Sequence, residues 1–179
     1  MKEVRGGRKM KIYYMTDLMK IANRIVRNPR YLFEKQADGT LKTFCNIAAW
    51  DFAESIGCGK FFSNKLRRPM LVEEIYVLVH ALGGSWRKIS DIEAITLATE
   101  GNFVIAIQRG KPGIVDLEDH IVVVLPGTIF SKKWNKKVPL CLNIGKENFI
   151  RGINFAFKTE PEYFLWIKTK GGNGSDSSM

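Results

Sequence analysis

The spacing of apolar residues changes near residue 100, and this change constrains the fold more than any other feature. Before that point, apolar side chains recur about every three to four residues, which is the period of an amphipathic helix. After it, they form short β-branched or aromatic runs separated by Gly, Pro, Lys and Asn, a composition typical of strands and turns. The sequence therefore predicts an α+β domain in which helices come first, an antiparallel sheet comes second, and the helices pack on the sheet.

Capping and breaking residues set the bounds of the predicted helices. Thr16 is a plausible cap for the first helix, and Asn28-Pro29 is its stop. Ser90 and Glu93 form a capping box that begins the fourth helix. The predicted helices cover residues 16–27, 45–56, 69–82 and 91–99, and the predicted strands cover residues 103–107, 121–125, 138–142 and 163–167.

The length of 179 residues and the 45% apolar content are sufficient for one compact domain. We predict this domain over residues 16–169, after a basic extension at 1–15 and before a disordered tail at 170–179 that has nothing to bury. We expect a monomer. No stretch reaches the ~18 apolar residues of a membrane span, and no apolar run of a signal peptide follows the basic start. A phage lysin, an injected toxin and a trimmed secreted enzyme all remain open as sources.

The net charge of +10 points to an anionic partner. The positive charge is concentrated in four runs, at residues 2–11, 24–30, 60–68 and 132–137. Such a surface favours nucleic acid, anionic lipid or an acidic wall polymer, and charge alone does not choose among them. A solvated basic face without a specific partner also fits each run. Because no nucleic-acid motif of recognised spacing is present, we do not expect nucleic acid as the partner.

Three widely spaced cysteines, Cys45, Cys58 and Cys141, resemble neither a disulfide framework nor a zinc cluster. At least one thiol must therefore be free. Cys45 is predicted at a helix start, where partial positive charge and free N–H groups lower the pKa of a thiol and can bind an oxyanion. The alternative is that Cys45 is a small, buried and inert residue.

Two histidines are present, and only one lies in a setting suited to catalysis. His120 directly precedes the apolar run at 121–125, so its ring would be held rigidly at the end of the sheet and face a cleft there. Asn143 follows the next predicted strand and is the best candidate to orient that ring. A histidine bonded to a carbonyl and an ordinary turn asparagine are the alternatives. His80 lies on a predicted helix and is expected at the surface.

Four segments resemble motifs of one enzyme family. The string TFCN at 43–46 resembles the T-x-C-N nucleophile motif of NlpC and CHAP amidases, and DHIVV at 119–123 resembles their G-H-V-A-V strand. NIGKENF at 143–149 and NFAF at 154–157 are similar to the Q-A-G-x-x-N-F and N-Y-A-F pieces of some members. The resemblance spans roughly residues 31–168. Two positions depart from it, because Asp119 replaces a small residue and Asn143 replaces a glutamine.

This resemblance implies a papain-like fold and a cysteine hydrolase. It assigns Cys45 as the nucleophile, His120 as the base and Asn143 as the orienting group, with a thioester intermediate and no metal or cofactor. The implied partner is peptidoglycan or another anionic cell-envelope polymer, cut in its stem peptide or between N-acetylmuramic acid and L-alanine. Asp119 is expected to raise the pKa of the imidazole or to narrow the cleft. The alternatives are a basic binding module without turnover, for nucleic acid or wall, and a papain-like hydrolase or acyltransferase acting on another amide or a lipid.

Overall fold

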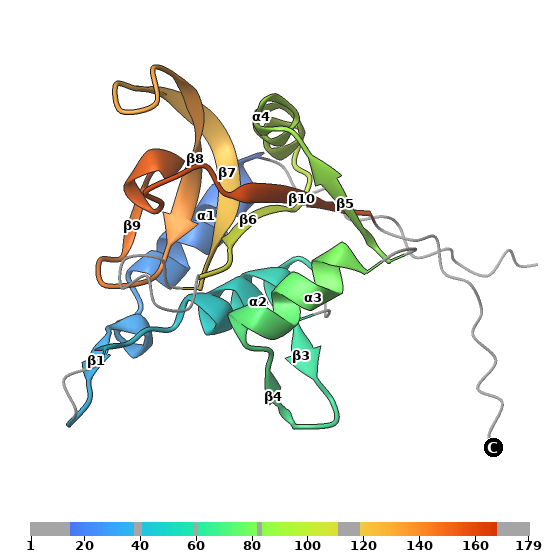
Figure 1. The fold of residues 1–179 in the computed structure, drawn as a ribbon, viewed down its shortest axis with the longest axis vertical. Coiled ribbons are helices and arrows are strands. Elements are labelled where there is room, and N and C mark those ends of the chain that lie inside the picture. The colour runs from blue at the N-terminus through green and yellow to red at the C-terminus, as the bar shows by residue number, and fades with distance from the viewer. Residues whose placement is uncertain (1–14, 38–40, 59–60, 82–83, 111–118, 168–179) are drawn as a thin grey trace, which may run out of the picture.

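The computed structural model describes residues 15–37, 41–58, 61–81, 84–110 and 119–167 (Figure 1). The predicted tail at 170–179, the basic run at 2–11 and all but the last residue of the predicted extension lie outside these residues. Within them, the helices are α1 (Met15–Val26), α2 (Cys45–Ser55), α3 (Val72–His80) and α4 (Asp91–Thr99), with two 3-10 helices, η1 (Pro29–Tyr31) and η2 (Ile153–Phe155). None of the described helices is long and apolar enough to cross a membrane.

A six-stranded antiparallel sheet forms the centre of the described chain, in the order β5-β10-β6-β7-β8-β9. Two short pairs, β1–β2 and β3–β4, lie outside it. The strands of the large sheet are β5 (Trp86–Ile89), β6 (Val104–Gln108), β7 (His120–Ser131), β8 (Lys136–Asn143), β9 (Phe149–Gly152) and β10 (Glu162–Trp166). The short pairs are β1 (Glu34–Lys35) with β2 (Leu41–Lys42) and β3 (Phe62–Ser63) with β4 (Arg68–Pro69).

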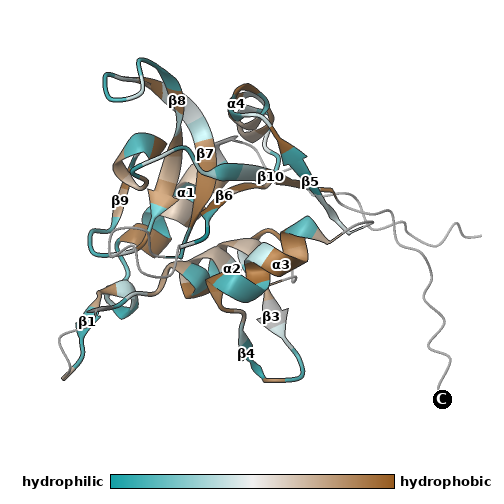
Figure 2. Ribbon diagram, viewed as in Figure 1, coloured by the Kyte–Doolittle hydropathy of each residue, from teal (hydrophilic) through white to brown (hydrophobic). Residues whose placement is uncertain are grey.

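Both faces of the large sheet are covered, so the sheet is the middle layer of three. Helices α1, α2 and α3 bury one face, including Ile121 and Val123 of β7. Helix α4 buries the other face, including Val122 and Val124. In Figure 1, α4 lies on the opposite side of β5 and β10 from α2 and α3, and in Figure 2 β6 and the part of β7 beside it are brown. Burial on both faces explains why these strands are continuous apolar runs instead of alternating ones.

The predicted α+β class is confirmed, with four helices and a six-stranded antiparallel sheet within the described residues. Helix α4 has the predicted bounds, and Ser90 and Glu93 form the predicted capping box with bonds of 3.2 and 2.9 Å. Helix α3 begins at Val72, later than predicted, because Arg68–Pro69 pairs with β3 instead. Gly57 ends α2 with a φ of +75°, as expected of a left-handed stop.

The prediction that all helices precede the sheet is wrong. Strand β5 lies between α3 and α4 in the sequence and forms one edge of the sheet. At this edge the ring of Trp86 stacks on that of Phe61, with 5.3 Å between the ring centroids. Strand β9 forms the other edge. The middle residues of β5, Arg87 and Lys88, are exposed, so this segment lacks the apolar run of a central strand. Strand β7 also continues past its predicted end to Ser131, through an irregularity at Gly127, whose φ is +106°.

Candidate active site

Helix α2 places Cys45 at its first residue. The first helical bond runs from the Ala48 N–H to the Phe44 carbonyl at 2.9 Å, and among the described residues no side chain caps this helix start. The first N–H groups of α2 therefore have no partner within the helix and point out of its end. Asn46 holds the start of α2 against the segment before α3, because its Nδ2 donates a hydrogen bond to the Met70 carbonyl at 2.8 Å.

The ladder between β7 and β8 brings His120 and Asn143 together. His120 is the first residue of β7, Asn143 is the last residue of β8, and the register pairs Val123 with Leu142. Side chains alternate along a strand, so this register puts His120 and Asn143 on the same face at the same end of the sheet. The His120 Nε2 lies 2.7 Å from the Asn143 Oδ1.

The hydrogen bonds of Asn143 determine the tautomer of the neutral His120 ring. The Asn143 Nδ2 donates to the Glu147 carbonyl at 2.6 Å, so the Oδ1 is the atom that faces the ring. An amide oxygen only accepts, and the Nε2 must therefore carry a proton. This leaves the Nδ1 as the basic nitrogen, and we assign the contact with the Cys45 thiol to it. The ring is thus oriented to accept a proton from sulfur.

The Cys45 thiol hydrogen-bonds to His120 and is only 5% exposed. Burial by itself would raise the pKa of this thiol. The hydrogen bond to His120, the positive charge of its ring and the N–H groups of Ile121 and Asn46 outweigh burial, so the pKa of Cys45 lies below its ordinary value. The same N–H groups are suited to bind negative charge that develops on a substrate oxygen next to the sulfur.

The other two cysteines lie elsewhere in the core. Cys141 lies in β8 and is fully buried, and burial raises the pKa of its thiol strongly. Cys58 follows α2 and is also fully buried. All three thiols are free of disulfides. In contrast to Cys141, Cys45 has hydrogen bonds that offset the cost of ionising a buried thiol.

A cavity of about 460 Å³ opens beside His120 and Asn143. Thr43 lines it from the segment before α2, and Phe157 lines it from the segment after η2, with its ring centroid 5.3 Å from that of His120. Cys45 is not among the described lining residues and lies instead in a closely packed layer between α2 and β7. The cavity thus reaches the His120 imidazole, and the Cys45 side chain is covered.

The connection between β8 and β9 holds Asn143 in place. The Gly145 N–H donates to the Asn148 Oδ1 at 3.1 Å, and the Asn148 Nδ2 donates to the Tyr31 carbonyl at 3.0 Å. A Cβ at Gly145 would lie 3.6 Å from both the Asn143 Nδ2 and the His120 Cε1, which is ordinary contact distance. These bonds link the site to η1, more than a hundred residues away in the sequence.

Asp119 also lines the cavity, where it replaces the small residue of the family motif. Its Oδ1 accepts a hydrogen bond from the Gly110 N–H at 2.6 Å. The carboxylate is therefore engaged at the start of β7 by a backbone donor.

The structure brings together the three residues that were predicted for the site, Cys45, His120 and Asn143. His80 is at the surface, as expected. Sequence reasoning did not identify the Glu147 carbonyl, Phe157 or the lysines of the cavity as parts of the site. The segment 143–149, which resembles an NlpC motif, contains Gly145 and Asn148. The spacing of its residues did not indicate the hydrogen bonds that these two residues make.

Comparison of the chain with protein-family models and with curated protein sequences finds no match. The geometry at Cys45, His120 and Asn143 therefore carries the functional argument.

Proposed function

We propose that this protein is a cysteine hydrolase of amide bonds, with Cys45 as the nucleophile, His120 as the general base and Asn143 as the orienting residue. The observation that carries the proposal is the hydrogen-bonded series from Asn143 through His120 to Cys45, at an uncapped helix start and beside a cavity. A nucleophile, a base that contacts it and a third group that orients the base are the requirements for covalent acyl transfer.

The proposed reaction has two halves. The Cys45 thiolate attacks the amide carbon, and the N–H groups of Asn46 and Ile121 stabilise the oxyanion. His120, protonated by the thiol, gives its proton to the leaving nitrogen as the C–N bond breaks, leaving a thioester. His120 then takes a proton from water, which attacks the thioester. The C–S bond breaks, a carboxylic acid leaves, and the thiol is restored.

We further propose a papain-like fold of the NlpC and CHAP kind and peptidoglycan as the substrate. Support for the fold comes from the order of the site along the chain, with a cysteine at a helix start, then a histidine at the start of a core strand, then a polar residue at the end of the next strand. The choice of peptidoglycan rests on the resemblance of the motifs at 43–46 and 119–123. A net charge of +10 favours approach to an anionic envelope.

The burial of Cys45 has a consequence for substrate binding. Thr43 and His120 line the cavity and Cys45 does not, so a substrate in the cavity reaches the sulfur only if side chains around the thiol move. Catalytic contacts in unliganded enzymes often tighten only when substrate binds, so a covered thiol is compatible with turnover.

Digestion of purified peptidoglycan tests the proposal. Wild-type protein and the Cys45→Ser variant would be incubated with peptidoglycan, and the released fragments identified by mass spectrometry. Only the wild type should release fragments, and their masses identify the bond that is cut. Cys58→Ala is the matched control, because it removes a buried thiol outside the site, and circular dichroism verifies that each variant is folded. Equal digestion by Cys45→Ser would refute the proposal. Sedimentation of all proteins with the wall and digestion by none would favour a binding module.

A further inference from the structure

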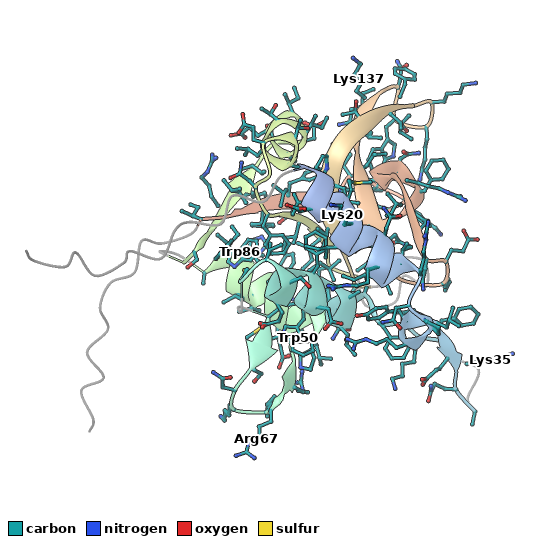
Figure 3. All side chains as sticks on the ribbon, turned by 180° about the vertical axis from the view of Figure 1, so that it is seen from behind. Lys20, Lys35, Trp50, Arg67, Trp86 and Lys137 are labelled. Carbon is teal, nitrogen blue, oxygen red and sulfur yellow. The ribbon has the colours of Figure 1, made fainter. Side chains whose placement is uncertain are left out.

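The outer part of the β7–β8 hairpin projects from the large sheet. Strand β6 pairs with β7 only up to Val124, and β9 pairs with β8 only from Leu140 onward. Residues 128–139, which we call the outer hairpin, therefore pair only with each other among the described strands. Figure 1 shows the outer hairpin extending past β6 and β9, and Figure 3 labels Lys137 on it. The outer hairpin is thus a protruding part of the surface.

The outer hairpin carries four lysines and no acidic residue. One of these lysines is neutralised by the body of the protein, because the Lys136 Nζ lies 2.6 Å from the Asp91 Oδ2 and 2.5 Å from the Glu160 Oε1. Asp91 is the first residue of α4, so these ion pairs also hold the hairpin against that helix. The other three lysines are exposed, at positions 132, 133 and 137.

The charges of the three exposed lysines are not cancelled within the described part of the chain. No described Asp or Glu forms an ion pair with Lys132 or Lys137. The Lys133 Nζ donates to the Phe157 carbonyl at 3.1 Å, and a carbonyl has no net charge. Three like charges on one projecting turn produce a positive potential that attracts an anionic partner.

An exposed phenylalanine lies beside these charges. Phe130 is 59% exposed, and the register of β7 with β8 places it directly opposite Lys137. Opposite residues of an antiparallel pair project to the same face, so the Phe130 ring and the Lys137 ammonium group are neighbours. The preceding residue, Ile129, is also exposed, at 36%. The outer hairpin therefore presents apolar surface next to positive charge.

This combination fits the surface of an anionic phospholipid bilayer better than it fits a charged polymer. Lysines attract the headgroup phosphates, and an aromatic side chain can enter the boundary between the headgroups and the acyl chains. Proteins that bind a nucleic-acid strand track it along a groove, with several aromatic rings for successive bases. The outer hairpin instead presents one exposed ring, that of Phe130, on a projecting turn.

We propose that the outer hairpin docks the protein on the surface of an anionic phospholipid membrane. Lys132 and Lys137 contact the headgroup phosphates, and Phe130 enters the boundary with the acyl chains. This docking is peripheral and does not depend on the chemistry proposed for Cys45. It selects anionic lipid, for this surface, from the polyanions that the net charge alone leaves open.

Co-sedimentation of the full chain with lipid vesicles tests the proposal. One set of vesicles is phosphatidylcholine alone, and the other is equimolar phosphatidylcholine and phosphatidylglycerol. The measured quantity is the partition coefficient between vesicle and solution. The protein should bind the anionic vesicles and not the neutral ones, and added salt should weaken this binding. Absence of binding to the anionic vesicles at low salt would overturn the proposal.

Variants of the outer hairpin separate the charged contribution from the apolar one. The double change Lys132→Gln and Lys137→Gln should lower the partition coefficient roughly 25-fold, a factor of about five for each lysine near the membrane surface. Phe130→Ser should lower it roughly fivefold, because part of an apolar side chain no longer leaves water, and Phe130→Trp should retain binding. All of these side chains are exposed, and circular dichroism verifies that the variants are folded.

The β3–β4 hairpin supplies the matched control. Its turn also carries exposed basic and apolar side chains, Lys65, Leu66 and Arg67, and in Figure 3 the labelled Arg67 lies at the opposite end of the view from Lys137. The double change Lys65→Gln and Arg67→Gln removes the same charge as the lysine variant, and Leu66→Ser is the apolar counterpart of Phe130→Ser. Each should change the partition coefficient less than about twofold, since salt screens charges that lie away from the contact.

A soluble polyanion distinguishes a membrane from a charged polymer as the partner. Inorganic polyphosphate offers phosphate groups without an apolar phase, so Phe130→Ser should bind it as wild type does. If Phe130→Ser also binds anionic vesicles as tightly as wild type, the outer hairpin is a general polyanion surface and the membrane proposal is overturned. If the β3–β4 variants weaken vesicle binding as much as the outer-hairpin variants, the attraction belongs to the net charge of the protein, and the proposal is overturned as well.

Discussion

The regions around His120 and His80 share one hydrogen-bond distance but differ in their surroundings. In each, the imidazole Nε2 lies 2.7 Å from a side-chain oxygen, that of Asn143 for His120 and that of Glu162 for His80. The His80 Nδ1 is bonded to the Tyr76 carbonyl at 2.8 Å, so both nitrogens of this ring face oxygen acceptors. The other partner of His120 is the Cys45 thiol.

The surroundings of the two rings explain this difference. His80 lies at the exposed end of α3, and its partner Glu162 also pairs with Lys88 at 3.2 Å, so the region is a surface ion-pair cluster. His120 lies at the end of the central sheet, between a helix start and a cavity. A polar partner for a histidine is therefore a weak sign of catalysis. A hydrogen bond from the ring to a thiol is the feature that distinguishes the His120 region.

Removing each imidazole in turn is the most direct test of the difference between the two histidines, and it should have the largest effect. His120→Ala should lower kcat/KM on a soluble stem peptide at least ~10²-fold, the scale of losing a general base. His80→Ala should change it less than about twofold, since surface pairs contribute little. Turnover is measured by separating the products by chromatography. Binding to wall fragments, measured by sedimentation, should be similar in both variants. If His120→Ala cleaves the peptide as fast as wild type, the proposed base is wrong.

Changing the orienting residue should have a smaller effect. Asn143→Ala removes the acceptor of the His120 Nε2, but water can take its place, and we expect kcat to fall roughly 10-fold while KM changes little. Asn143→Gln, which restores an amide, should recover part of the loss. Glu162→Ala is the matched change in the His80 region and should leave turnover unaffected. If Asn143→Ala has the same kcat and KM as wild type, Asn143 does not orient His120 for catalysis and has only a structural role.

The sequence located the three candidate site residues better than it located the edges of the sheet. Cys45, His120 and Asn143 lie at the ends of elements with strong apolar patterns, so locating those elements also located the three residues. The edge strands β5 and β9 escaped prediction because half-exposed strands mix polar and apolar residues. A cleft beside His120 was predicted, but the lysines that line it were not, because they come from three connections that only the folded chain brings together.

The pH dependence of Cys45 alkylation is a further test of the difference between His120 and His80. The pKa of Cys45 is lowered, so the rate of its reaction with iodoacetamide should rise with pH around a midpoint below that of an ordinary thiol. In His120→Ala, burial persists without the imidazole, and the midpoint should move above the ordinary value. In His80→Ala it should not move. Cys58 and Cys141 should remain unmodified in native protein, and faster labelling at Cys58 than at Cys45 would contradict this assignment.

The smallest expected effect concerns stability in the two regions. Glu162→Gln breaks ion pairs with His80 and Lys88 whose side chains are 34% and 59% exposed, so the free energy of unfolding should fall by less than about 1 kcal/mol, and by less still at high salt. Asn143 is only 5% exposed. Its change to alanine removes its hydrogen bonds to the His120 Nε2 and the Glu147 carbonyl, and because water replaces them only in part, the free energy of unfolding should fall by about 1–3 kcal/mol with little dependence on salt. Urea unfolding at low and high salt measures both. A larger and salt-sensitive loss for Glu162→Gln would mean that the His80 cluster is a structural centre, and the contrast between the two histidines would then lie in chemistry alone.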